Sequence, residues 1–188
     1  MSGERSRHLR LVGTALALLA ELIHLAWEHF HGGIIRHHIL NRSDLPAISN
    51  AWGAVLLPLV TWYLIGRVIK RVAPVEDGRP GGLPSHVLFG FAGALLFGLL
   101  LSGGFALRQS ALTEVLFQGL LLLALLLPVY RAECVLGFVL GMTFVFGVVL
   151  PTAIASIIAM LSMLLHRGVY PLVVHLWAGL IHKRGRPT

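Results

Sequence analysis

The sequence predicts an all-α, polytopic transmembrane helical bundle, and three observations lead to this fold class. Of the 188 residues, 56% are hydrophobic and only 12% are charged, whereas soluble domains average about 25% charged residues. Apolar runs of about 17 to 25 residues, the length that crosses a bilayer as a helix, follow one another along nearly the whole chain. No segment of soluble composition is left to fold separately. We therefore predict a single integral membrane domain, residues 1–188, with six spans.

The first two predicted spans, residues 11–30 and 45–69, flank a polar stretch. Gly32 and Gly33 follow the first apolar run, and glycine is both a poor helix former and a frequent helix terminator. Asp44 precedes the second run, and aspartate commonly caps helix N-termini by accepting hydrogen bonds from free backbone N–H groups. We therefore expect the second helix to begin immediately after this residue.

The third and fourth predicted spans, residues 86–107 and 111–129, form a helical hairpin. A linker of residues 70–84, with three prolines and three glycines, separates them from the second span and should be irregular and exposed to water. Only residues 108–110 connect the two apolar runs, which leaves room for no more than a tight turn. The third and fourth helices should therefore run antiparallel.

The apolar segment of residues 134–165 is too long for one upright helix, since about 30 residues at about 1.5 Å each exceed a hydrocarbon core of about 30 Å. Pro151 is the natural break, because proline lacks the backbone N–H that a helix interior needs. This interpretation favours two spans, residues 134–150 and 152–170, followed by a basic segment, residues 171–188. One kinked and tilted helix, which would reduce the total to five spans, is the alternative.

The net charge of +7 predicts the orientation of the bundle. The basic residues lie in short stretches between apolar runs, where lysine and arginine mark cytoplasmic loops, so no nucleic-acid partner is expected. Six spans place both termini, the 70–84 linker and the turn at Arg131 on one side. We therefore predict a protein of a bacterial-type cytoplasmic membrane, in contact with membrane lipid and with both termini in the cytoplasm. The sequence leaves the oligomeric state open.

One polar stripe interrupts the first span. Its members follow one another at spacings of three, four and three residues: Glu21, His24, Glu28 and His31. At 3.6 residues per turn, this spacing confines them to an arc of about 80°. A carboxylate at the bilayer centre costs about 2.5 to 3.5 kcal/mol, so the stripe should face the bundle interior and find a partner, a proton or a metal. His37 and His38 follow in the next loop.

In the six-span topology, the outer ends of the other helices bring further polar residues to the depth of this stripe. They are Asn50, Arg108, Glu114 and Gln118. Glu114 and Gln118 are four residues apart and therefore share one face of their helix. The single cysteine, Cys134, excludes an intrachain disulfide, a cysteine-based zinc site and an iron–sulfur cluster.

These residue types predict a divalent transition metal, either zinc, iron or manganese, because imidazole and carboxylate can hold such an ion and leave a position open for water. The predicted ligands are Glu21, His24, Glu28, His31, His37 and His38. The leading hypothesis is a metal-dependent membrane enzyme that acts at the outer leaflet on a lipid or lipid-linked substrate. Glu28 and Glu114 would then be the catalytic acid–base residues. The substrate-binding residues would be Arg108, Asn50 and Gln118.

Other interpretations of the same residues stay open. In a proton- or cation-coupled transporter, the Glu and His side chains would form a relay, which requires comparable polar residues in the inner half of the bundle. The sequence offers only His86, Glu133 and His166 there. In a purely structural network, the stripe would fix helix packing through hydrogen bonds. Haem is a weaker alternative, because the outer half has histidines only on the first span and its following loop.

Overall fold

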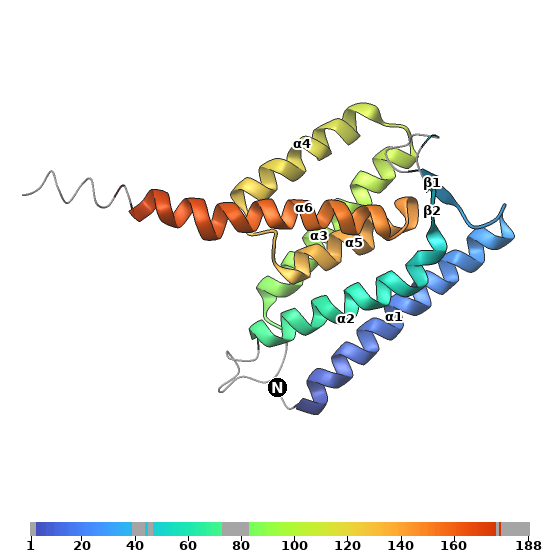
Figure 1. Ribbon diagram of the computed structural model, residues 1–188, viewed down its shortest axis with the longest axis horizontal. Coiled ribbons are helices and arrows are strands. Elements are labelled where there is room, and N and C mark those ends of the chain that lie inside the picture. Colours follow the sequence, from blue (N-terminus) through green and yellow to red (C-terminus); the bar gives the residue numbers. More distant parts are fainter. Residues whose placement is uncertain (1–2, 39–43, 45–46, 73–82, 176, 178–188) are drawn as a thin grey trace, which may run out of the picture.

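The computed structural model describes residues 3–38, 44, 47–72, 83–175 and 177. This part of the chain folds into a helical bundle, which confirms the predicted all-α class (Figure 1). Its six helices are α1 (Gly3–Phe30), α2 (Gly53–Val72), α3 (Ser85–Ala106), α4 (Ser110–Leu126), α5 (Ala132–Phe146) and α6 (Val149–Leu164). Two short strands, β1 (Arg36–His38) and β2 (Ala47–Ser49), lie between α1 and α2 in the chain.

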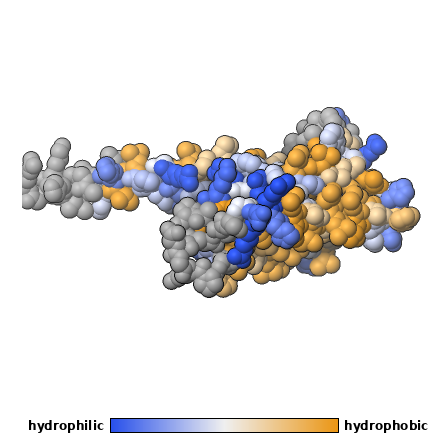
Figure 2. Space-filling view, turned by 90° about the horizontal axis from the view of Figure 1, so that it is seen from below, coloured by the Kyte–Doolittle hydropathy of each residue, from blue (hydrophilic) through white to orange (hydrophobic). Residues whose placement is uncertain are grey.

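The helices have the composition of a membrane protein. Four helical stretches are long and apolar enough to cross a bilayer. They are α1, α3, α2 with the 3₁₀ turn before it (Asn50–Val72), and α6 with the π-helical turn Leu165–Val169 and the helix after it (Val149–His175). The other two, α4 and α5, are apolar but have only 17 and 15 residues, so α5 measures about 22 Å against a core of about 30 Å. Figure 2 shows apolar side chains over much of the face that it presents. The number of helices that cross the membrane stays a prediction.

The closest packing in the bundle joins α3 and α5, which run parallel. A Cβ atom on Gly98 would lie 2.8 Å from the carbonyl oxygen of Phe138, and one on Gly141 would lie 2.5 Å from that of Leu95. Real Cβ atoms do not approach so closely, so these glycines allow the two backbones to touch. The hydroxyl of Ser102 donates a hydrogen bond of 3.2 Å to the carbonyl of Gly141 across the same contact.

The break between α5 and α6 lies at Gly147 and not, as the sequence predicted, at Pro151. Gly147 has φ +66° and ψ −175°, a conformation that is open almost only to glycine. Pro151 lies in the first turn of α6, where a missing backbone N–H leaves no helical hydrogen bond unmade. The structure therefore agrees with two helices in this segment, but the residue that separates them is Gly147 and not Pro151.

The second helix begins later than expected. Residues 47–49 pair with residues 36–38 as an antiparallel ribbon in which His37 lies opposite Ile48, so they are extended where a first helical turn was predicted. A 3₁₀ turn, Asn50–Trp52, follows, and the hydroxyl of Ser49 accepts a hydrogen bond of 3.2 Å from the backbone N–H of Ala51. Ser49 thus has the capping role that we had assigned to Asp44.

The helix contacts define two ends of the bundle. At the end that carries β1 and β2, the ribbon end, the rings of Phe105 and Phe146 lie 4.7 Å apart, which brings the C-termini of α3 and α5 together. At the opposite end, the basic end, Arg71 of α2 meets Glu133 of α5. The hydroxyl of Ser162 donates to the carbonyl of Leu127, so α6 runs back beside the C-terminus of α4 toward the basic end. The start of α1 and the end of α6 therefore lie at the same end (Figure 1).

Candidate functional site

The polar stripe of α1 faces α2, and the two helices lie side by side and antiparallel (Figure 1). Arg10 contacts Trp62 near the basic end of this pair, while Glu28 contacts Asn50 at the ribbon end. Three residues of the stripe are buried, each with no more than 9% of its surface exposed: Glu21, His24 and Glu28. The predicted inward orientation of these three residues is what the structure shows.

Glu28 is held by several donors. The side-chain amide of Asn50 donates a hydrogen bond of 2.7 Å to Oε1, and the backbone N–H of Ile35 donates one of 3.1 Å to Oε2. The Nε2 atom of His24 lies 3.4 Å from Oε1. Both oxygens of the carboxylate are therefore occupied, which fixes its orientation and offsets part of the cost of burying it.

Asn50 reaches Glu28 because the β-ribbon and the α5–α6 turn position it. Its backbone N–H donates a hydrogen bond of 3.0 Å to the carbonyl of Ile35, one residue beyond the β1–β2 pairing. Its side-chain amide lies directly over Gly147, where an added Cβ would overlap Asn50 Oδ1. Gly147 thus serves two purposes, since it both turns the chain between α5 and α6 and leaves space for the side chain of Asn50.

Glu21 has the opposite environment. It is 1% exposed, and neither carboxyl oxygen has a hydrogen-bond partner among the described residues. The carboxyl group rests against the Cα of Gly53, where a Cβ would overlap it, and Val148 packs beside the same glycine. An ionised carboxylate without partners is very costly in such surroundings. Glu21 therefore requires a proton, a cation or a water molecule.

Further buried polar atoms lie on both sides of Glu21 along the bundle. The hydroxyls of Thr14 and Thr61, the Nε atom of Arg10 and the Nδ1 atom of His24 are buried without a hydrogen-bond partner among the described residues. Arg10 is anchored by its other nitrogens: Nη2 donates to the carbonyl of Trp62 at 3.2 Å, and the guanidinium lies 4.1 Å from the centre of that residue's ring. Arg10, Thr14 and His24 share one face of α1 with Glu21, and we call this set, together with Thr61 of the packed helix α2, the polar row.

The inner part of this polar row, from Arg10 to Thr14 with Thr61, was not among the predicted site residues. The signal was present, because the stripe spacing of three and four residues extends backward from Glu21 through Ala17 to Thr14 and Arg10. Ala17 interrupts the polar pattern, and threonine is common in apolar spans. The pattern therefore did not lead us to predict Thr14 or Arg10 as site residues. Thr61 had no such signal, since only the packing of α2 against α1 brings it to the row.

Of the three outermost histidines in the predicted ligand set, His31 is not part of this buried group. His31 is exposed, its Nδ1 atom lies 2.8 Å from the carbonyl oxygen of Trp27, and its ring stacks on the ring of Trp27 at 4.5 Å. The backbones of His37 and His38 belong to β1, while their side chains lie outside the described part of the structure.

Arg108, Glu114 and Gln118 lie on other elements. Arg108 occupies the α3–α4 turn with φ +55° and is exposed, as are Glu114 and Gln118 on α4. α4 packs mainly against α3 and α6. Within the described ranges, no hydrogen bond or ion pair joins these three residues to α1. Their catalytic and substrate-binding roles stay predictions, as does the substrate-binding role of Asn50.

The described side chains include no group of three or more His, Cys, Asp or Glu residues that could hold a metal ion. Comparison of the chain with protein-family models, with curated proteins and with solved structures finds no match. Chemically, the site combines a carboxyl group without partners, an imidazole, a fixed carboxylate and nearby hydroxyls. Such groups accept, hold and release protons.

Proposed function

We propose that the α1–α2 contact binds and relays protons, with Glu21 as the exchangeable site, and that the protein is a proton-coupled carrier. The observation that supports this proposal is the polar row, in which buried atoms on one face of α1, from Arg10 to His24, have no hydrogen-bond partner among the described residues. Intramembrane ionisable residues commonly form proton relays in pumps and transporters. The row provides the inner polar residues that such a relay needs.

Each member of the row contributes according to its chemistry. Glu21 and His24 can bind and release a proton, whereas the hydroxyls of Thr14 and Thr61 can donate and accept hydrogen bonds without changing charge. Arg10 keeps its proton at all accessible pH values, so it ends the relay and does not carry it. Water molecules that bridge these polar atoms would complete the path, because buried polar sites of this kind hold water.

The hypothesis of a metal-dependent enzyme has less support than the hypothesis of a proton relay. A catalytic metal needs about three protein ligands with one position left open, and the described side chains do not assemble such a set. Glu28 also already accepts hydrogen bonds on both oxygens. A relay, by contrast, needs a group that is held in place and a neighbouring group that can gain and lose a proton. Glu28 would be the first of these groups and Glu21 the second.

The test compares Glu21→Gln with wild type in liposomes, using infrared difference spectroscopy between acid and alkaline pH. We expect a buried carboxyl band that titrates in wild type and is lost in Glu21→Gln. A dye inside the liposomes should also report faster proton entry with wild type than with this variant. Glu114→Gln is the matched control, because Glu114 is exposed on α4, and it should behave as wild type in both measurements.

Two results would contradict the relay. One is an infrared spectrum of Glu21→Gln that is identical to that of wild type, which would mean that Glu21 does not exchange a proton. The other is one equivalent of zinc, iron or manganese in protein purified without chelator and lost on Glu21→Gln substitution. That second result would restore the metal site, with ligands that include histidines outside the described side chains.

A further inference from the structure

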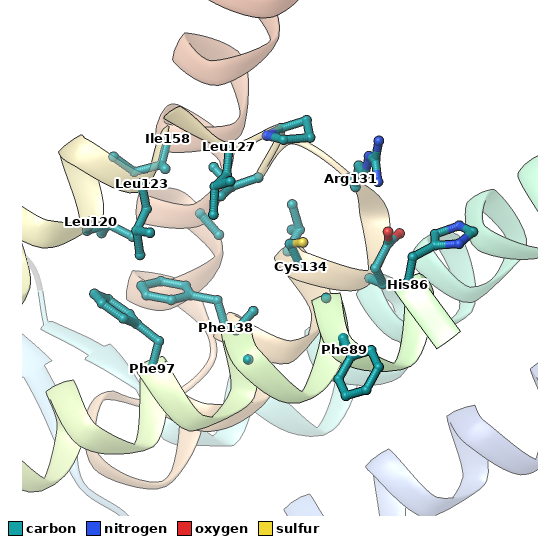
Figure 3. Close-up of a pocket in the computed structure, with 18 residues that line it drawn as sticks. His86, Phe89, Phe97, Leu120, Leu123, Leu127, Arg131, Cys134, Phe138 and Ile158 are labelled. Carbon is teal, nitrogen blue, oxygen red and sulfur yellow. The ribbon is translucent and has the colours of Figure 1, made fainter. Parts of the chain in front are cut away.

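A second candidate site lies at the basic end of the bundle, away from the α1–α2 contact. It is a cavity of about 380 Å³ between α3, α4, α5 and α6. Most of its lining is apolar, and Figure 3 shows Phe97, Leu123, Phe138 and Ile158 around it. The volume falls within the range of about 300 to 1,000 Å³ that is typical of small-molecule sites. At about 30 Å³ per group, as for a water molecule, it holds roughly a dozen methylene-sized groups.

Polar residues line one part of this cavity. Glu133 is 2% exposed, and its Oε1 accepts a hydrogen bond of 2.6 Å from Arg71, while Oε2 is buried with no partner among the described residues. His86 and Arg131 also line the cavity (Figure 3). Arg131 is exposed and forms no ion pair with any described residue. Among the described residues, the lining thus offers a hydrogen-bond acceptor without a donor and a positive charge without an ion-pair partner.

We propose that this cavity binds a single-chain amphiphile whose anionic headgroup carries a hydroxyl, the chemistry of a lysophosphatidylglycerol. The hydrocarbon chain lies among the phenylalanine and leucine side chains. The phosphate pairs with Arg131, and a headgroup hydroxyl donates to Oε2 of Glu133. Because a buried carboxylate oxygen without a donor is costly, the ligand supplies the missing donor.

The headgroup decides which amphiphile binds. Lipid tails are as apolar as the cavity lining, so a chain that leaves the bilayer for the cavity gains little. The charge of Glu133 is balanced by Arg71, which leaves Arg131 as net positive charge among the described residues of the lining. Arg167, whose guanidinium lies 5.2 Å from the ring of Tyr130, adds a second cation at this end. The charges therefore favour an anionic headgroup over a zwitterionic one.

Cys134 provides a direct probe, because it lines the cavity, is partly buried and is the single cysteine of the chain. The full-length protein is placed in phosphatidylcholine nanodiscs, and the rate of maleimide labelling is measured with added lysolipid. Lysophosphatidylglycerol should slow labelling about tenfold, whereas lysophosphatidylcholine of equal chain length should have little effect. Arg131→Gln should weaken the binding of lysophosphatidylglycerol about tenfold, as expected for the loss of one charged hydrogen bond.

Two glycines on α3 provide a matched pair of variants. An added Cβ would meet no atom within 4 Å at either Gly93 or Gly103. Gly93 lines the cavity, whereas Gly103 does not. Gly93→Leu should fill the cavity and abolish the effect of lysophosphatidylglycerol on labelling, while Gly103→Leu should leave it unchanged. Native mass spectrometry of the same samples should show one bound lysophosphatidylglycerol in wild type and none in Gly93→Leu, and it decides the matter if Cys134 does not react.

The outcomes that would overturn the proposal are distinct from those for the proton relay, because this site shares no residue with the polar row. Equal protection by both lysolipids would refute the recognition of an anionic headgroup. No protection and no bound lysophosphatidylglycerol would refute the site itself. Undiminished binding to Gly93→Leu would show that the lysolipid binds elsewhere on the protein.

Discussion

Glu21 and Glu28 are seven residues apart on one helix face, yet their surroundings differ in a way that determines what each can do. Glu28 accepts hydrogen bonds from Asn50 and from the backbone of Ile35. Glu21 is buried to the same degree but has no hydrogen-bond partner among the described residues. The donors around Glu28 fix the orientation of its carboxylate, whereas the carboxyl group of Glu21 has no such donors among the described residues.

A first prediction follows from this difference between the two carboxyl groups. Glu28→Gln should lower the free energy of unfolding by about 1 to 3 kcal/mol, because the new NH₂ group must point at one of the two donors that the carboxylate accepted. Glu21→Gln should cost little, since it removes no hydrogen bond. Thermal melts of both variants in the same detergent measure the effect, and equal losses for the two would contradict it.

A second prediction concerns the contact between Glu21 and Gly53. Because a Cβ at Gly53 would overlap the carboxyl group of Glu21, Gly53→Ala should destabilise the protein by about 1 to 3 kcal/mol. In a Glu21→Ala background the overlap with the carboxyl group is gone and only the 3.1 Å approach to Val148 is left, so the same substitution should cost less. Gly119→Ala on α4, where a Cβ meets no atom within 4 Å, is the control. Additive effects of the Gly53 and Glu21 substitutions would argue against the contact.

At the scale of the elements, the turn between α5 and α6 matters most to the site. It reverses the chain with a glycine-only conformation at Gly147 and presents that glycine to the side chain of Asn50. The β-ribbon holds Asn50 from the other side, through its backbone hydrogen bond to Ile35. The β-ribbon and the α5–α6 turn thus fix the donor that orients Glu28.

A third prediction tests which residue makes the break. Gly147→Ala should destabilise the protein by at least about 1 to 3 kcal/mol, the usual cost of such a backbone conformation for a residue with a Cβ, with the overlap with Asn50 in addition. Pro151→Ala should change stability by about 1 kcal/mol or less, because this proline lies in a first helical turn. Chemical denaturation of the two variants compares them. A larger loss for Pro151→Ala would return the break to the proline.

At the scale of the whole molecule, α1 packs antiparallel to α2, and α3 packs parallel to α5. α6 runs back to the basic end. Arg71, Arg131 and Arg167 all lie toward that end, and cytoplasmic surfaces of membrane proteins are enriched in arginine and lysine. The positive-inside rule therefore predicts that the basic end lies in the cytoplasm and the ribbon end outside.

A fourth prediction is that reporter fusions follow this orientation. Fusions after Val72, after Tyr130 and after Lys183 should all report the cytoplasm, and a fusion after Arg108 should report the outer side. These signals correspond to six spans with both termini in the cytoplasm. An outer-side signal from the Lys183 fusion alone would favour five spans, and a cytoplasmic signal after Arg108 would mean that the α3–α4 turn does not reach the other side.

The sequence by itself determined the features that depend on local periodicity. Apolar runs predicted the helices, and the spacing of Glu21, His24 and Glu28 predicted that they share one buried face, because helical geometry repeats every 3.6 residues whatever surrounds it. The proximity of Asn50 to this stripe also followed from the order of the spans. None of these inferences required knowledge of which helix faces meet.

Only the tertiary structure decided which polar atoms have partners. Ile35 and Asn50 donate hydrogen bonds to Glu28, Gly53 leaves room for Glu21, and Thr61 joins the row from α2. The tertiary structure also places Glu114 on an exposed face of α4 and forms the cavity beside Cys134. The physical reason is that hydrogen bonding, burial and cavities depend on contacts between residues distant in the chain, and periodicity along one helix carries no information about the helix that packs against it.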